Sequence, residues 1–379
     1  MLGRVVCAMS GGVDSAVAAY LLKKKGHSVT GCFMVNWDSR DETGDDDGCS
    51  MEQDLFDARR VCERLNMPLV EVNFTRQYWN EVFESLLDGY GRGVTPNPDV
   101  LCNRHIKFGH LLRHALEQLG ADALATGHYA RSSADDLQRL HADEKVRLLV
   151  PTDVFKDQTY FLAQIRQSSL RHVLFPLAAL TKPQVRRLAA SIGCDFLNRK
   201  KESMGICFIG KRKRFGQFLS RYIEPEQGDV VDWETCTKVG THSGVAFYTV
   251  GQCVPHLNTT YQQAFVAHTD VPNNILYVVR GSNHRALFSR TLTTEPAEWI
   301  ADFDVPTGSA VHCRMRCQRM MPLQACHLTR LVDGRLHVTL KRPLRAIRQG
   351  QLVAFYDTDG VECYGGAAII DNGFAALRS

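Results

Sequence analysis

The sequence predicts an α/β fold, with a doubly wound parallel sheet followed by small β domains, the last of them a β-barrel. Three observations predict it. Short apolar runs alternate with helix-like stretches over residues 1–210, which favours parallel strands joined by crossover helices. A glycine-bearing turn, residues 10–15, follows the first of those runs. From residue 227 onward, short β-rich runs recur between turn residues, a pattern typical of small barrels.

The α/β half is predicted element by element. Residues 5–9 are apolar and partly β-branched, which indicates a buried strand. Residues 13–25 repeat apolar positions at helical spacing and end before a glycine, which indicates a helix. The same criteria predict strands at 28–35, 69–74, 122–126 and 148–151, helices at 50–65, 78–90, 103–119, 156–168 and 182–192, and polar loops at 36–49 and 134–145.

The β-rich half has no internal repeat that would define its domains. The strands that we predict there cover residues 229–232, 245–250, 275–279, 310–315, 326–331, 336–340 and 352–356. We place domain boundaries near residues 210 and 285. This gives an α/β domain at 1–210, a central β-rich domain at 211–284 and a C-terminal β-barrel at 285–379.

Composition restricts the class of protein. The chain has 379 residues, of which 44% are hydrophobic, and a net charge of +4, which suits nucleic acid without indicating it. No apolar run would span a bilayer, and we recognise neither a secretory signal nor a mitochondrial presequence. The 13 cysteines indicate a reducing compartment, and none has zinc-knuckle spacing, so we expect no membrane contact and no structural metal.

The turn at residues 10–15, Ser-Gly-Gly-Val-Asp-Ser, is suited to hold an anion. Gly11 and Gly12 allow a sharp bend and a close approach of the backbone to a ligand. The helix that follows directs its first N–H groups toward the space above the turn. Common nucleotide loops end in Gly-Lys-Ser or Gly-Lys-Thr, but this turn contains no lysine. For these residues alone, an ordinary strand-to-helix turn is the alternative.

Two further stretches place cysteines in unusual settings. In residues 95–103, Thr-Pro-Asn-Pro-Asp-Val-Leu-Cys-Asn, the prolines stiffen a turn before a predicted helix. A cysteine near a helix N-terminus gains thiolate character, and Asp99 could move protons there. Cys207 lies between two glycines in the stretch 205–210. Taken separately, the first stretch is an ordinary capped surface turn and Cys207 an ordinary buried cysteine.

The order of these motifs resembles that of the tRNA-specific 2-thiouridylases, which belong to the PP-loop ATP pyrophosphatases. The motifs are SGGVDS at 10–15, NWD at 36–38, TPNPDVLCN at 95–103, TGHYAR at 126–131, FKDQTY at 155–160 and GICFIG at 205–210. The similarity covers residues 4–222 closely and the remainder more weakly, and it is greatest to the mitochondrial branch. Residues 253–272 depart from the family pattern, which leaves one RNA-facing loop of the central domain undefined.

The resemblance implies ATP-dependent thiolation of C2 of the wobble uridine in tRNA for Lys, Glu and Gln, through an adenylated uridine. The ATP phosphates, with Mg²⁺, would be held by the turn residues Ala8, Met9, Ser10, Gly11, Gly12, Val13, Asp14 and Ser15. Met34 and Gly127 would contact the nucleotide. The target base would meet Asn97, Pro98 and Asp99, the last as general acid or base. Contacts to tRNA would come from His128, Lys156, Asp157, Gln158, Arg314, Met315 and Gln351.

The resemblance also implies how sulfur arrives. A donor protein would load a persulfide on Cys207, Cys102 would attack or assist it, and the two would end as a transient disulfide that a cellular reductant resets. The tRNA partner would be bound by its anticodon arm, in the mitochondrion or, alternatively, the cytoplasm. Three other possibilities stay open: another PP-loop ligase, a non-catalytic RNA-binding protein, and an iron–sulfur cluster held by Asp99, Cys102 and Cys207.

Overall fold

The computed structural model describes residues 2–37, 50–140, 145–200, 215–254, 257 and 263–374. Its N-terminal part is built on a parallel sheet in the order β3-β2-β1-β4-β7. The strands are β1 (Arg4–Met9), β2 (Ser28–Val35), β3 (Leu69–Asn73), β4 (Ala123–Ala125) and β7 (Val173–Leu174). Because β1 lies between β2 and β4, the strand order reverses there, and ligands of such sheets bind at the carboxyl ends of those strands.

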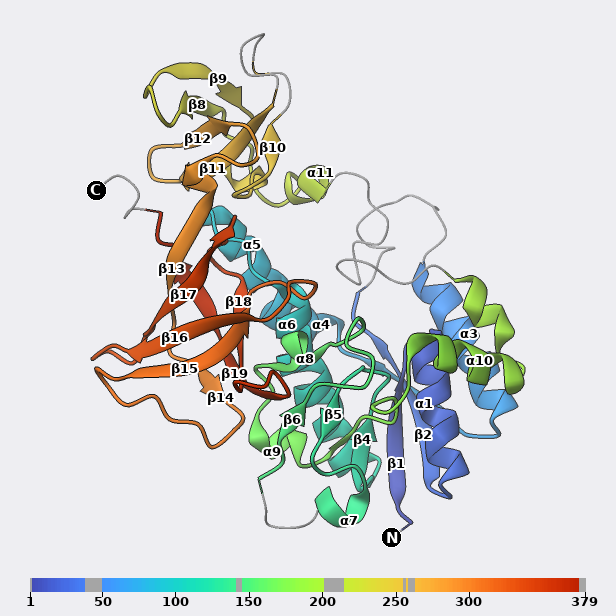
Figure 1. Cartoon of the computed structure of the whole chain (residues 1–379). Helices are drawn as coiled ribbons and strands as arrows, with labels where there is room; N and C mark the ends of the chain where they lie inside the picture. The colour runs from blue at the N-terminus through green and yellow to red at the C-terminus, as the bar shows by residue number, and fades with distance from the viewer. Residues whose placement is uncertain are drawn as a thin grey trace.

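Helices cover both faces of this sheet, so its inner strands are largely apolar on both sides. On one side lie α1 (Val13–Lys24), α3 (Ser50–Arg64) and α10 (Lys182–Ser191) (Figure 1). Two longer helical stretches are divided into α4 (Thr75–Tyr78), η1 (Trp79–Phe83) and α5 (Glu84–Gly91), and into α6 (Pro98–Leu101), η2 (Cys102–Leu111) and η3 (His114–Gln118). The shorter helices are α7 (Leu137–Leu140), α8 (Thr159–Leu162), α9 (Gln167–Leu170), η4 (Asp195–Arg199) and α11 (Phe215–Leu219).

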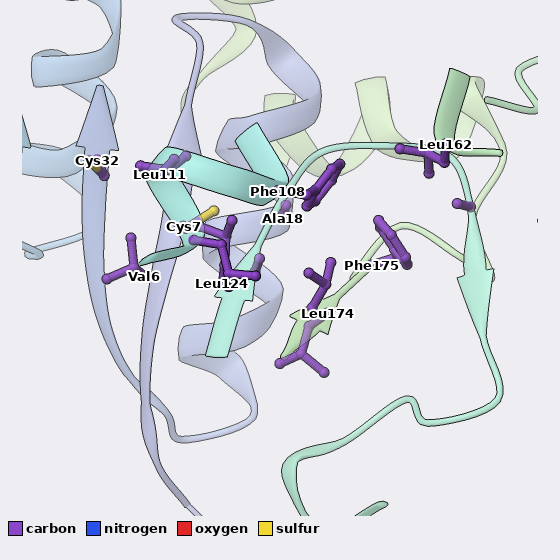
Figure 2. Close-up of a cluster of buried hydrophobic side chains, with 14 of the residues drawn as sticks. Val6, Cys7, Ala18, Cys32, Phe108, Leu111, Leu124, Leu162, Leu174 and Phe175 are labelled. Atoms are coloured by element: carbon purple, nitrogen blue, oxygen red, sulfur yellow. The ribbon is translucent and has the colours of Figure 1, made fainter. Parts of the chain in front are cut away.

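The core of this part lies between the sheet and η2. Figure 2 shows side chains of β1, β2 and β4 packed against Phe108 and Leu111 of η2. The others labelled there are Val6, Cys7, Ala18, Cys32, Leu124, Leu162, Leu174 and Phe175, and all of them are buried. A sheet buried in this way holds the ends of β1, β2 and β4 rigidly, which positions any site built on them.

The C-terminal part is a closed β-barrel. Its sheet follows the order β13-β17-β16-β15-β18-β19, and β13 also pairs with β19, which closes the ring. The strands are β13 (Phe288–Thr294), β15 (Ala310–Arg316), β16 (Gln324–Arg330), β17 (Leu336–Arg345), β18 (Leu352–Tyr356) and β19 (Glu362–Asp371), with β14 (Glu298–Trp299) on β19. Inward-facing residues such as Met315, Leu328, Val338 and Phe355 fill it.

This barrel sheet continues into the N-terminal part. β6 (Leu148–Leu149) pairs with β19, and β5 (Arg131–Ser132) pairs with β6. The N-terminal part and the barrel therefore share one sheet, although the predicted boundary near residue 285 separates them in the sequence. Ile300, Leu352 and Tyr356 also belong to the main buried cluster of the N-terminal part.

The central part forms a smaller sheet in the order β10-β11-β12-β8-β9, set apart at the top of Figure 1. Its strands are β8 (Gly228–Asp232), β9 (Lys238–His242), β10 (Cys253–Val254), β11 (Ala264–Asp270) and β12 (Ile275–Arg280), with short helices η5 (Val245–Phe247) and η6 (Arg285–Leu287). Nowhere in the described ranges does a helix combine the length and the apolar character needed to cross a membrane.

The predicted fold class is confirmed, and three of the elements that differ from prediction have a clear physical reason or a direct bearing on the site. The helix predicted from residue 103 begins at Pro98, because the Asn97 side chain caps it by accepting from the N–H groups of Asp99 and Val100. The helix predicted over 156–168 is wrong: α8 and α9 are separate single turns. The strand predicted over 245–250 is wrong too, since Gly244, with φ of 144°, turns the chain into η5.

Candidate functional site

The phosphate turn, residues 10–15, lies at the carboxyl end of β1 and leads directly into α1. Gly11 has φ of 65°, which favours glycine, and Gly12 is the N-cap of α1 without any side-chain cap. The Ser15 hydroxyl accepts from the Ser10 N–H and donates to the Gly12 carbonyl. The turn is thus fixed from inside by Ser15. Because the N-cap is a glycine, no cap side chain accepts from the first N–H groups of α1, which suits a phosphate.

Two neighbouring strands bring the remaining predicted nucleotide residues to this turn. Met34 lies near the carboxyl end of β2, which pairs with β1 in parallel. Gly127 follows β4, on the other side of β1, and packs so closely on α1 that a Cβ there would lie 2.8 Å from the Ser15 nitrogen. The predicted nucleotide residues therefore lie around one crevice, where the strand order reverses.

Substitution of Gly11 is expected to damage this turn severely. A Cβ at Gly11 would overlap the backbone carbonyl of Asp54, and the positive φ adds strain. We expect Gly11→Ala to lose about 2–4 kcal/mol of stability from strain and overpacking together. Gly12→Ala is the matched control, because its Cβ would meet only Ser10 Oγ at 3.3 Å. Thermal unfolding measures both, and equal unfolding temperatures for the two variants would contradict the assignment.

Asp14, in the first turn of α1, is held by residues from distant parts of the chain. Lys182 Nζ, from the start of α10, lies 2.8 Å from each Asp14 carboxylate oxygen. The Tyr129 hydroxyl donates to the same carboxylate at 2.9 Å. The Lys182 side chain is 10% exposed and that of Asp14 33% exposed, so the carboxylate is the member that faces the crevice.

A second lysine lies on the other side of the turn. Lys200 Nζ donates to the Gly11 carbonyl at 3.0 Å and to Asp54 at 2.7 Å, and it pairs with the buried Asp57. Burial acts to lower the pKa of Lys200, but its hydrogen bonds to Asp54 and Asp57 outweigh burial and raise that pKa. Lys200 therefore stays charged, and it attaches the segment that directly follows η4 to the phosphate turn.

The second predicted motif, residues 95–103, forms a loop that the C-terminal barrel supports. The Gln351 amide donates to the Thr95 carbonyl at 2.6 Å, and the Thr95 N–H donates to the Gln349 carbonyl at 2.8 Å. Tyr160 hydrogen-bonds the Asn97 side chain. Gln351, predicted from the resemblance to contact tRNA, thus holds the loop that carries Asn97, Pro98 and Asp99.

Lys107 of η2 influences the charges of both Asp99 and His128. Burial raises the pKa of the Asp99 carboxyl above its usual value, and Lys107 partly opposes this. Burial lowers the pKa of His128 well below its usual value, and Lys107 lowers it further, so this imidazole is neutral at pH 7. His128 Nδ1 lies 2.8 Å from Thr126 Oγ1, and its ring packs on Phe108.

The predicted tRNA-contacting motif Lys156-Asp157-Gln158 is only partly available for contact. Gln158 accepts from the Tyr129 N–H, and Lys156 is half-buried. Asp157 is buried, forms an ion pair with Arg316 of the barrel, and accepts from Thr159. The expectation that the Asp157 side chain meets tRNA does not hold in this conformation, because its carboxylate is committed to a buried network between the two parts of the chain.

The pair Arg314 and Met315 in β15 requires a second correction. Arg314 is exposed on the outer face of the barrel, but Met315 is completely buried in its interior. Successive residues of a strand point to opposite faces, so both side chains cannot face the same RNA. Arg314 remains a predicted tRNA contact, whereas the side chain of Met315 is a core residue.

Of the two predicted catalytic cysteines, Cys102 lies among the described residues and Cys207 does not. Cys102 is buried one turn inside the continuous helix of α6 and η2, since that helix begins at Pro98. The prediction that it lies at the helix N-terminus is therefore wrong by one turn, and the helix dipole acts on it more weakly. Cys207, with its stretch 205–210, lies outside the described residues, and so does Asp38.

Sequence reasoning assigned no individual role to Lys182, Lys200, Tyr129, Lys107 or Phe155, although Tyr129 and Phe155 lie within motifs that it identified. Phe155 is 78% exposed beside Lys156, an arrangement that suits stacking on an unpaired base. The signal for Lys182 is its position, directly before Pro183 at a predicted helix start, but nothing local indicates which carboxylate it meets. Long-range pairing of this kind follows from the fold and not from local pattern.

Comparisons with known proteins agree along the whole chain. Three family models match in succession: "tRNA methyl transferase HUP domain" at residues 3–211, "tRNA methyl transferase PRC-barrel domain" at 216–280, and "Aminomethyltransferase beta-barrel domain" at 289–369. The first of these matches more than half of the chain.

Named relatives cover nearly the full length. The chain is 45% identical to mitochondrial tRNA-specific 2-thiouridylase 1 of Drosophila melanogaster, over 98% of this chain and 94% of that one. It is 41% identical to the Homo sapiens protein of that name, over 99% and 92%. It is 42% identical to the tRNA-specific 2-thiouridylase of Staphylococcus carnosus, over 97% and 95%. With this identity over nearly its whole length, the chain belongs to the tRNA-specific 2-thiouridylase family.

Proposed function

We propose that this protein catalyses the ATP-dependent 2-thiolation of the wobble uridine in tRNA for Lys, Glu and Gln. The observation that supports this most is the arrangement around β4. The phosphate turn packs against Gly127. The charge of Lys107 acts to lower the pKa both of His128, the next residue, and of Asp99. A nucleotide on the turn and a base at Asn97, Pro98 and Asp99 would therefore be neighbours.

The first chemical step is adenylation of the uracil O2. A carbonyl oxygen is a poor leaving group, but AMP leaves readily. As O2 forms its bond to the α-phosphorus, the bond to the bridging oxygen breaks and pyrophosphate departs with the electron pair. Asp99, whose pKa is raised by burial, takes the uracil N3 proton as general base. Asp14 and Ser10 are the oxygen ligands that the turn offers to Mg²⁺, which supplies positive charge to the triphosphate when bound.

The second step is sulfur transfer. The terminal sulfur of a persulfide on Cys207 attacks C2, and AMP leaves. The Cys102 thiolate then attacks the Cys207 sulfur, which releases 2-thiouridine and leaves a Cys102–Cys207 disulfide. A donor protein supplies the persulfide, and a cellular reductant restores both thiols.

The described ends of the chain around residue 207 support this assignment. Lys200 is tied to the phosphate turn, seven residues before Cys207. Seven residues span at most about 24 Å. On the other side, Phe218 of α11 packs on Phe83 of η1, and η1 packs against α6, which carries Asp99. Both attachment points therefore lie beside the parts of the proposed site.

The anticodon arm is the part of tRNA that fits this arrangement, because it carries the wobble base in a single-stranded loop. We assign phosphate contacts to Arg314 on the outer face of the barrel and to Lys156, with Phe155 available for base stacking. The protein acts in the mitochondrion, as the names of its animal relatives indicate. Imaging of the full-length chain with a C-terminal fluorescent tag tests this, and a purely cytosolic signal would reverse it.

Gln351 offers a test of whether the barrel positions the base loop. We expect Gln351→Leu to lower the thiolation rate about tenfold, because the Thr95 and Pro96 carbonyls each lose the hydrogen bond that the Gln351 amide donates, while tRNA affinity changes less than about twofold. Arg314→Ala is the matched control. It should lower tRNA affinity and make that affinity less sensitive to salt concentration, while the single-turnover rate stays close to the wild type. Equilibrium binding and single-turnover rates measure both. A Gln351→Leu protein that loses affinity without losing rate would restore the direct tRNA contact.

The function itself is tested by pyrophosphate release with unmodified tRNA transcripts, followed by mass spectrometry of the tRNA for 2-thiouridine. We expect release to require tRNA whose wobble base is uridine. Release that needs a different acceptor would identify another PP-loop ligase. Binding of tRNA without any release would identify a non-catalytic RNA-binding protein.

A further inference from the structure

The phosphate turn contains no lysine of its own, but the fold delivers one to it. Lys182 Nζ lies 2.8 Å from both carboxylate oxygens of Asp14, a residue of the turn, although 168 positions separate them. The ammonium also lies 5.8 Å from the centre of the Tyr129 ring. A cation that contacts β- and γ-phosphates is the component that this turn lacks by comparison with the common nucleotide loops.

The backbone of Lys182 is fixed, whereas its long side chain can move. Its N–H donates to Asp153 at 2.8 Å, and Thr181 and Gln184 form a capping box around the start of α10. The four methylene groups of the side chain let the ammonium change partners without any movement of α10. Asp14, in contrast, is a short side chain fixed in the first turn of α1.

The electrostatic surroundings separate this lysine from the other one at the turn. Lys200 is balanced by two carboxylates, Asp54 and Asp57, and by the Gly11 carbonyl. Lys182 pairs with the carboxylate of Asp14, whose side chain is 33% exposed and faces the crevice. If the pair served packing alone, two apolar side chains would serve as well, since buried ion pairs contribute little net stability.

We propose that Lys182 exchanges Asp14 for the triphosphate when ATP binds, and that it stabilises the charge that collects on pyrophosphate as the α-phosphorus bond breaks. This inference rests on the proposed function for the identity of the acceptor, but not for the binding of ATP. The exchange releases Asp14 as an oxygen ligand. Lys182 then contacts the phosphates as the loop lysine does in the common Gly-Lys-Ser and Gly-Lys-Thr nucleotide loops.

The test compares Lys182→Met, which keeps the length of the side chain without its charge, with Lys182→Arg. Lys23→Met is the matched control: Lys23 is a lysine of α1 that donates to the Leu65 and Asn66 carbonyls, away from the turn. Three quantities are measured on the full chain: ATP affinity without tRNA, the rate of tRNA-dependent pyrophosphate release, and tRNA affinity.

We expect Lys182→Met to bind ATP at least tenfold more weakly and to release pyrophosphate at least 100-fold more slowly, with tRNA affinity unchanged. Lys182→Arg should recover part of the ATP affinity, and Lys23→Met should match the wild type. ATP affinity and pyrophosphate release at wild-type levels in Lys182→Met would overturn the proposal.

Two further outcomes keep the inference distinct from folding and from the function. If Lys182→Met does not fold, Lys182→Gln, which removes the charge but keeps a polar end, decides: a weakened ATP affinity at an unchanged unfolding temperature supports the proposal, and wild-type affinity overturns it. Because ATP binding needs no tRNA, a wild-type chain that binds ATP but fails to thiolate tRNA would refute the proposed function and leave this test intact.

Discussion

Cys102→Ser protein is expected to adenylate tRNA at the wild-type rate and then to stop before 2-thiouridine forms. Cys102 lies one turn after Asp99 on the same helix and is buried, so serine fits the site while removing the nucleophilic sulfur. Loss of a nucleophile of this kind typically costs about 10⁴-fold in rate or more. Pyrophosphate release and 2-thiouridine, measured on the same sample, separate the two steps.

Two other variants complete this experiment. Cys207→Ser should fail to load persulfide at all, whereas Cys102→Ser should still load it. Cys62→Ser is the control, because Cys62 is a core residue whose pKa burial raises to about 12, and it should lose stability only. Mass spectrometry after one turnover without reductant should find a Cys102–Cys207 disulfide. Both thiols reduced after completed thiolation would instead indicate sulfur from a cluster or from free sulfide.

The second large effect is expected at Arg316, which joins the barrel to the catalytic half. Its guanidinium pairs with Asp157 and donates to the Tyr356 hydroxyl, and all three residues are buried. Arg316→Met leaves the Asp157 carboxylate without its partner in the interior. Breaking a buried pair in this way costs about 3–5 kcal/mol. Thermal unfolding and limited proteolysis should both show the two parts separating.

A double variant identifies the cause. Arg316→Met combined with Asp157→Asn removes both charges and should recover much of the lost unfolding temperature. Arg335→Met is the surface control. Because the ion pair of Arg335 with Asp333 is solvent-exposed, this variant should leave the unfolding temperature unchanged. If the single and double variants unfold at the same temperature, the unpaired carboxylate is not the source of the loss.

The sequence could predict those parts of the site whose geometry is local. The phosphate turn, its strand and its helix are contiguous, so their residues alone indicated an anion site. Alternation along β15 could also have separated Arg314 from Met315, because neighbouring strand residues face opposite sides. Asp157 gave no such signal, as its partner Arg316 lies in another part of the chain.

The rest depends on long-range contacts that no local pattern encodes. Lys182 and Asp14 meet because α10 packs beside α1, and Gln351 meets Thr95 because the barrel returns to the catalytic half. The error at residues 245–250 has a local cause, since an apolar run looks like a strand until Gly244 turns the backbone. The family resemblance indicated which residues take part in the reaction, whereas only the folded structure shows which distant residues contact them.

The pairing of β6 with β19 has a consequence for synthesis on the ribosome. Leu148 pairs with Cys363, so the β6 edge is synthesised long before its partner strand. At about 5–20 residues per second, that edge waits on the order of 10–40 s before its hydrogen-bonding groups are matched. An unmatched edge can pair with another chain. The nascent protein is therefore most vulnerable to aggregation just before β19 emerges, and chaperone dependence should be greatest at that stage.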